Sequence, residues 1–136
     1  AVVFWSGTGN TEEMANAVLE GMKENGADAS IYSADAFQAG GVEGYDAIAF
    51  GCPAMGAEVL EEDEFQPLFD ECKSALAGKK VALFGSYGWG DGEWMRNWED
   101  DCREAGIELA CNSVVCNDAP DEDAITACKE LGAALA

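Results

Sequence analysis

The sequence predicts an α/β fold in which a five-stranded parallel sheet, in strand order 2-1-3-4-5, carries helices on both faces. Short apolar runs alternate five times with segments of helical periodicity along the 136 residues, and such alternation is typical of parallel sheets. Glycine-containing loops follow the first, third and fourth apolar runs, where open α/β sheets bind ligands. The length suits one core, so residues 1–136 are expected to form a single domain.

The strands are expected where apolar residues run together. They are residues 1–5, 29–33, 45–50, 81–84 and 107–116. The fourth is expected to break at Gly85, and the fifth at Asn117. Cys111 and Cys116 lie five positions apart in the expected fifth strand, so their side chains are predicted to point to opposite faces of the sheet.

The helices are expected where apolar residues recur every three or four positions. They are residues 12–25, 65–76, 94–105 and 121–135. Gly26 suits the left-handed position that ends the first helix, and Asp121 suits the N-cap of the last. Residues 37–43, with two glycines, predict a loop or an irregular helix.

The loop Ser6-Gly7-Thr8-Gly9-Asn10-Thr11 joins the first strand to the first helix. Its glycines allow the backbone to approach an anion closely, and a helix N-terminus favours negative charge. The loop lacks the lysine of a Walker motif and the third glycine of a dinucleotide fingerprint. It therefore predicts a phosphate site built from dipoles. An ordinary glycine-rich turn with a good helix cap is the alternative for this loop taken alone.

Two further loops leave the same predicted edge of the sheet. Their sequences are Gly51-Cys52-Pro53-Ala54-Met55-Gly56-Ala57-Glu58 and Ser86-Tyr87-Gly88-Trp89-Gly90-Asp91-Gly92. Trp89 stands between two glycines, where it has few core neighbours and suits stacking on a planar ring. Met55 is unbranched and polarizable, which suits the opposite face of the same ring. A surface aromatic and a core methionine are the plainer interpretations of each residue alone.

The chain is strongly acidic, with 27 Asp and Glu against 7 Lys and Arg, a net charge of −20 and no histidine. This excludes histidine acid–base catalysis and argues against binding to nucleic acid or to an anionic membrane. A strongly acidic surface attracts cationic partners and favours a monomer. No apolar run approaches the length of a membrane helix, so a cytoplasmic location is expected.

The six cysteines include no Cys-x-x-Cys pair of the kind that binds zinc or iron–sulfur clusters. We expect them to be free, mostly buried thiols in a reducing compartment, and we expect no metal site.

The three loops together resemble those of flavodoxins, in particular the short-chain flavodoxins of anaerobic bacteria. The similar segments are Ser6–Thr11, Gly51–Gly56 and Leu83–Gly90, which occur in the family's order. The resemblance runs nearly from end to end of the chain with the family's spacing. The resemblance implies a flavodoxin-like three-layer sandwich that binds flavin mononucleotide (FMN) without covalent attachment.

The resemblance also implies roles for particular residues. Met55 and Trp89 would sandwich the isoalloxazine ring, and Glu58 would accept a hydrogen bond from its N3–H. The peptide between Gly56 and Ala57 would change orientation in the semiquinone, although relatives often carry Gly-Asp or Gly-Ser at this turn. The implied FMN-binding residues are Ser6, Gly7, Thr8, Gly9, Asn10, Thr11, Ala54, Met55, Gly56, Ala57, Glu58, Ser86, Tyr87, Gly88, Trp89, Gly90 and Asn117.

The expected function is that of a low-potential one-electron carrier, which cycles FMN between its oxidised, semiquinone and hydroquinone forms. The carboxylates of Glu58 and residues 61–64 would disfavour the anionic, fully reduced flavin. Partners would be redox proteins with basic faces, docking transiently at an acidic rim near the flavin. The protein would not be a stand-alone catalyst.

The main alternative is an NAD(P)H-dependent flavin or quinone reductase of the same fold. Such an enzyme usually needs basic residues for the nucleotide phosphates, and the predicted site loops contain no Lys or Arg. A phosphotyrosine phosphatase would need Cys and Arg in the phosphate loop, and a receiver domain would need an Asp after the third strand. The sequence has neither set.

Overall fold

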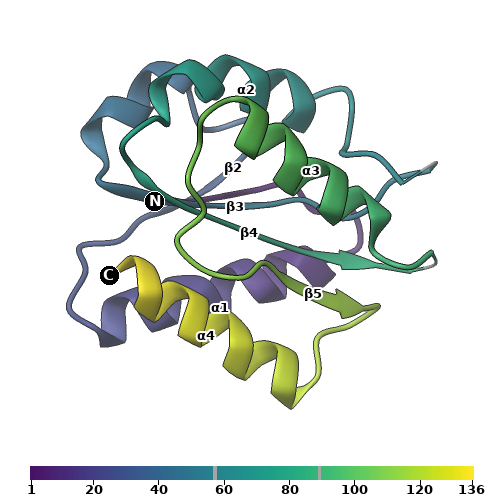
Figure 1. Cartoon of the computed structure of the whole chain (residues 1–136). Coiled ribbons are helices and arrows are strands. Elements are labelled where there is room, and N and C mark those ends of the chain that lie inside the picture. Colours follow the sequence, from purple (N-terminus) through teal and green to yellow (C-terminus); the bar gives the residue numbers. More distant parts are fainter. Residues whose placement is uncertain (57, 89) are drawn as a thin grey trace.

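The computed structural model describes residues 1–56, 58–88 and 90–136, so the predictions for Ala57 and Trp89 lie outside the described residues. Five parallel strands form a sheet in the order β2-β1-β3-β4-β5 (Figure 1). The strands are β1 (Val2–Phe4), β2 (Ile31–Ser33), β3 (Ala47–Gly51), β4 (Lys80–Tyr87) and β5 (Val114–Asn117). The predicted α/β fold and strand order are confirmed.

Helices cover both faces of the sheet and complete the three layers (Figure 1). The α-helices are α1 (Asn10–Glu24), α2 (Phe65–Cys72), α3 (Glu93–Glu104) and α4 (Glu122–Leu135), and the short 3-10 helices are η1 (Ala39–Gly44) and η2 (Lys73–Ala75). Adjacent residues of β1 face opposite layers: Val2 packs with α1 and α4, and Val3 packs with α2 and α3. The sheet is therefore buried on both faces, as expected of parallel strands.

Two glycines bring α1 and α4 into close contact beneath the sheet. A Cβ built on Gly132 of α4 would lie 2.2 Å from the carbonyl oxygen of Val18 in α1. A Cβ on Gly21 of α1 would lie 2.1 Å from the carbonyl oxygen of Lys129 in α4. The two helix backbones approach so closely that no side chain fits at either position.

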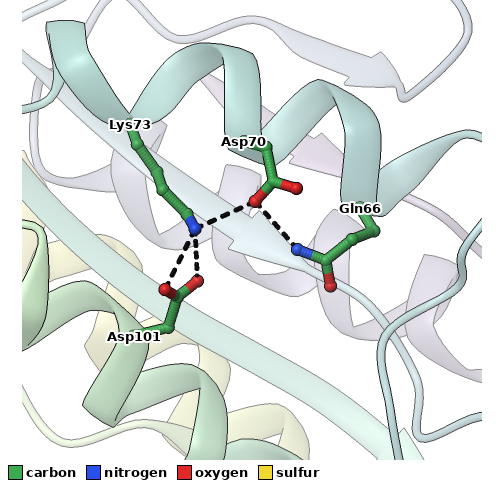
Figure 2. A network of polar contacts seen from close by, with 4 residues as sticks. All are labelled: Gln66, Asp70, Lys73 and Asp101. Atoms are coloured by element: carbon green, nitrogen blue, oxygen red, sulfur yellow. Dashed lines mark hydrogen bonds and ion pairs between the residues drawn. The ribbon is translucent and has the colours of Figure 1, made fainter.

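An ion-pair network ties α2 to α3 on the other face (Figure 2). The ammonium group of Lys73 lies 2.9 Å from Asp70 Oδ1 and 2.8 Å from Asp101 Oδ2. Gln66 donates a hydrogen bond to Asp70 Oδ1 at 3.0 Å, so the network runs along α2 to Lys73 at the start of η2 and then crosses to α3. It joins the two helices that follow the second and third predicted site loops.

The predicted end of the fourth strand at Gly85 is wrong, because β4 continues to Tyr87. Its last four residues, from Phe84 to Tyr87, pair with all four residues of β5. A Cβ on Gly85 would lie 2.2 Å from the carbonyl oxygen of Cys52. Glycine marks a close backbone approach within the strand rather than a break.

The predicted fifth strand is too long, because only Val114–Asn117 forms β5. Leu109 makes an isolated parallel bridge to Val81, and regular pairing resumes only where Val114 meets Phe84. Between these two pairings lie two residues of β4, Ala82 and Leu83, but four residues of the partner segment, 110–113. The partner segment must therefore bulge. The bulge also overturns the prediction for the cysteines, since Cys111 and Cys116 both pack on the layer of α1 and α4.

Two predicted helix ends are confirmed, whereas α2 ends at Cys72 rather than at residue 76 and passes into η2. Gly26 has a positive φ of 88° just after α1, and the carboxylate of Asp121 accepts a hydrogen bond from the N–H of Ala124 at the start of α4. The six cysteines are free, and four of them are buried. Across the described ranges, no helix combines the length and the apolar character that crossing a membrane requires.

Candidate functional site

The loop between β1 and α1 wraps around the side chain of Ser6. Its hydroxyl oxygen accepts hydrogen bonds from the N–H groups of Gly9 at 3.1 Å and Glu12 at 3.3 Å. Gly9 has a φ of 96°, which glycine adopts without strain, and α1 begins at the next residue. The loop therefore carries its own helix cap.

Other backbone donors of this loop are available to a ligand. Within the described ranges, the N–H groups of Gly7, Thr8, Asn10 and Thr11 donate no hydrogen bond. Thr11 is only 1% exposed, and its buried hydroxyl has no hydrogen-bond partner among the described residues. Several uncharged donors at a helix N-terminus fit a phosphate group, as the sequence predicts.

A cavity of about 220 Å³ opens beside this loop at the carboxyl edge of the sheet. Seven of the predicted site residues line it: Gly7, Thr8, Asn10, Ala54, Met55, Ser86 and Gly88. The structure thus brings the three predicted loops to one place, between the ends of β1, β3 and β4.

Three residues that line the cavity were not predicted: Trp5, Pro53 and Asp118. A Cβ on Gly7 would lie 3.2 Å from the indole of Trp5, which shows how closely the loop covers this ring. Trp5 was assigned to the first strand, but an aromatic residue at the carboxyl end of a strand was a usable signal. Asp118 directly follows β5 with a φ of 58°, a position that the same rule would have found.

We call the described residues Met55, Gly56, Glu58 and Val59 the hairpin, because Met55 and Val59 form an antiparallel bridge. The N–H of each donates to the carbonyl of the other, at 2.8 Å for Met55 and 3.1 Å for Val59. Gly56 and Glu58 both have positive φ, 44° and 57°. Oε1 of Glu58 is buried and has no hydrogen-bond partner among the described residues, so an acceptor is held ready in this turn.

Negative charge gathers next to the hairpin. Carboxylate oxygens of Glu58, Asp91 and Glu93 lie within 4.8 Å of one another. A Cβ on Gly90 would lie 2.0 Å from Oε1 of Glu58, so this glycine leaves room for the glutamate side chain. None of these three residues is among the described residues that line the cavity, but Glu58 lies three positions beyond Met55, which does line it, so a ligand there would experience the potential of the carboxylates.

Glu61 fixes the chain where the hairpin passes into α2. Its carboxylate accepts hydrogen bonds from the N–H groups of Asp63, Glu64 and Phe65, at 2.8–2.9 Å, and the residue is only 6% exposed. Burial alone would raise the pKa of the Glu61 carboxyl, but the three backbone donors outweigh it and hold that pKa below its usual range. An ionised carboxylate caps this end of the helix.

Eight of the described residues predicted for the site do not line the cavity: Ser6, Gly9, Thr11, Gly56, Glu58, Tyr87, Gly90 and Asn117. The ring of Tyr87 packs against the indole of Trp94, with centroids 5.5 Å apart. Asn117 donates to the carbonyl of Tyr87 at 3.3 Å. The hydroxyl of Ser86 does reach the wall, but it donates to the carbonyl of Asp118 at 2.6 Å. Tyr87 thus packs the end of β4 against α3, and Asn117 ties that end of β4 to the end of β5.

Comparison with known proteins finds one family along nearly the whole chain. Residues 2–132 match the family model for flavodoxin. The chain is 43% identical to a flavodoxin of Clostridium beijerinckii over 99% of this chain and 97% of that protein. It is 44% identical to a flavodoxin of Megasphaera elsdenii, over 99% and 96%. The solution structure of two-electron reduced Megasphaera elsdenii flavodoxin superimposes with a TM-score of 0.90 at 43% identity, covering 98% of this chain and 96% of that one.

Proposed function

Because the chain belongs to the flavodoxin family and is similar to short-chain members from anaerobic bacteria, we propose that it is a low-potential one-electron carrier. It holds FMN without covalent attachment and carries electrons between redox proteins. Family membership supports a flavin-binding electron carrier rather than a stand-alone catalyst. The observation that carries the proposal concerns the described residues: loop residues with unused backbone donors meet Met55 around one cavity, and the unpartnered Oε1 of Glu58 lies three positions beyond Met55.

The residues of this chain divide the binding of FMN between them. The unused N–H groups and the hydroxyls of the loop Ser6–Thr11 bind the phosphate by dipoles. Met55 supports one face of the ring, and the prediction that Trp89 covers the other concerns a residue outside the described ranges. The orphaned carboxylate oxygen of Glu58 fits an N–H donor of the ring.

The acidic surroundings tune the cofactor. FMN, when bound, supplies the redox chemistry. Glu58, Asp91 and Glu93 oppose any additional negative charge in the cavity, and the cluster of their oxygens within 4.8 Å strengthens this effect. Full reduction is therefore disfavoured, and the two electrons are taken up at separate potentials.

The partners are redox proteins with basic faces, which dock weakly at the acidic rim of the cavity. The net charge of −20 supports such steering and also supports a monomer. We propose that residues 1–136 work as a single flavin domain in the cytoplasm. The reductase alternative is disfavoured because no Lys or Arg is among the described residues that line the cavity.

An anaerobic reductive titration of the FMN-loaded protein, followed by absorption, tests this proposal. The expected result is a long-wavelength species at half reduction that disappears on full reduction. Bleaching in one two-electron step, together with oxidation of NADPH by the protein alone, would show that the protein is a reductase and would overturn the proposal. Failure to take up added FMN would end both.

A matched binding measurement tests the phosphate loop. Thr11→Val removes the buried hydroxyl and keeps the side-chain shape. We expect it to weaken FMN binding about tenfold, as for loss of one buried hydrogen bond, and to leave riboflavin binding unchanged, since riboflavin lacks the phosphate. Equal losses for both flavins would contradict a role of Thr11 in phosphate binding.

A further inference from the structure

Cys52, the first residue after β3, is held at three atoms. Its N–H donates to the carbonyl of Phe84 at 3.2 Å, and its sulfur accepts from the N–H of Glu61 at 3.3 Å. Its carbonyl oxygen accepts from the indole Nε1–H of Trp94 at 3.1 Å. Cys52 is fully buried and Trp94 is 1% exposed, so these bonds are shielded from water.

The Trp94 bond takes the place of a backbone bond. Among the described residues, no backbone N–H donates to the Cys52 carbonyl. The carbonyl faces Gly85, on which a Cβ would lie 2.2 Å from this oxygen and 3.1 Å from Cζ2 of Trp94. The oxygen is thus enclosed between the backbone of β4 and the indole.

The hairpin depends on this point. Only Pro53 and Ala54 separate Cys52 from Met55, and the N–H of Ala54 donates to the carbonyl of Ser86 at 3.1 Å. Both Pro53 and Met55 line the cavity. A shift of the Cys52 carbonyl would therefore reach the flavin-binding residues within three positions.

We propose that Trp94 is a positioning residue: its indole N–H fixes the Cys52 carbonyl and thereby holds the hairpin in the conformation that accepts the flavin. The effect on the hairpin stands on the structure alone, and its consequence for the flavin rests on the proposed function. Trp94 acts through Cys52 and the hairpin, without entering the cavity wall.

Trp98, one turn later in α3, offers a matched comparison. It is also buried, at 2% exposure, and its ring packs edge-on against Phe65 and Phe69. Its Nε1 makes no hydrogen bond to any described residue. Trp→Phe therefore leaves a similar space at either position, but only at Trp94 does it remove a donor that is in use.

Amide hydrogen exchange of the FMN-free protein tests the positioning directly. In Trp94→Phe, the amides of Met55 and Val59 should exchange about tenfold faster relative to Leu83 in the core, as expected for loss of one buried hydrogen bond. In Trp98→Phe, this ratio should not change. Equal ratios in the two variants would overturn the proposal.

Flavin binding tests whether the position of the hairpin affects the affinity for FMN. Trp94→Phe should raise the Kd for FMN about tenfold, whereas Trp98→Phe should not. Faster hairpin exchange with unchanged FMN affinity would overturn the link to the flavin. If no form of the protein binds FMN, the proposed function fails while the exchange result still decides the positioning role.

A second variant covers the case in which Trp94→Phe does not fold. A tryptophan analogue at position 94 with sulfur in place of the indole N–H keeps the ring and removes the donor. The same exchange ratio at Met55 and Val59 is measured. No increase in this variant would also overturn the proposal.

Discussion

Replacing Glu61 by glutamine tests the ionised helix cap, because glutamine keeps the size of the side chain and removes its charge. The carboxylate accepts three backbone N–H groups, two at Oε1 and one at Oε2. The amide of glutamine keeps one oxygen for Glu64 and Phe65, but its NH₂ group then faces the N–H of Asp63. One charge-assisted bond is lost, and the other two become neutral.

The magnitude follows from these bonds. A hydrogen bond to a charged group contributes about 1.5–3 kcal/mol, against about 1 kcal/mol for a neutral one. The lost bond and the two weakened bonds, if additive, together predict a loss of about 2.5–7 kcal/mol in the free energy of unfolding at pH 7. Because Glu61 is buried, solvent does not screen this effect strongly.

Urea unfolding of FMN-free protein measures the difference, with Glu62→Gln as control, since Glu62 is exposed and the change of charge is the same. A difference below about 0.5 kcal/mol between the two variants would refute the role of Glu61, because typical surface substitutions stay within that range.

The pH dependence of the free energy of unfolding tests the role of Glu61 a second time. The pKa of Glu61 is lowered in the folded state, so its stabilising effect is complete above the usual carboxyl pKa of about 4.3 and is lost as the pH falls through the folded value. The advantage of wild type over Glu61→Gln should therefore be constant near neutrality and shrink in acid. An advantage that grows in acid would contradict the assignment.

Three further predictions concern other parts of the molecule. Gly132→Ala should lower the free energy of unfolding, measured by thermal melts, by about 1–3 kcal/mol, because its Cβ meets the backbone of α1. Gly40→Ala, whose Cβ would meet nothing within 4 Å, should be nearly neutral in the same measurement. The double variant Asp91→Asn/Glu93→Gln should raise the potential of the second one-electron reduction by tens of millivolts, less at high salt, whereas changing the exposed Glu108 and Glu130 in the same way should leave it within error by spectroelectrochemistry. Lys73→Met should lower the free energy of unfolding by about 1 kcal/mol in low salt, since Lys73 pairs with both Asp70 and Asp101; Lys129→Met, which loses one longer pair to Glu20 at 3.5 Å, should have a smaller effect, and equal effects would show that the network adds nothing.

The sequence predicts the elements and their order because local patterns determine them. The alternation of apolar runs and helical periodicity predicts a parallel sheet with five strands, which fits the flavodoxin-like order 2-1-3-4-5, and the loops Ser6–Thr11 and Cys52–Glu58 predict where a ligand would bind. Helix ends such as Asp121 follow from the chemistry of one side chain. These features need no knowledge of what packs against them.

The errors arise where a distant contact decides the local structure. Gly85 looks like a strand end, but it lies inside β4 because the Cys52 carbonyl approaches it. The apolar run 107–116 looks like one strand, but its pairing with β4 shifts between Leu109 and Val114. No local pattern marks these two contacts. The cap by Glu61 is missed for a different reason: its bonds are local, but Glu61 lies four positions before α2, outside the usual N-cap position.

The bulge before β5 also bears on aggregation. β5 and β2 are the outer strands of the sheet, and an outer strand offers unpaired N–H and C=O groups on which another chain could add. β2 has three residues, and β5 has four, one of which is the exposed Val115. Because the chain leaves the sheet on the N-terminal side of Val114, a foreign strand finds only a short template there. The irregularity that defeats strand prediction thus limits edge-to-edge growth of the sheet.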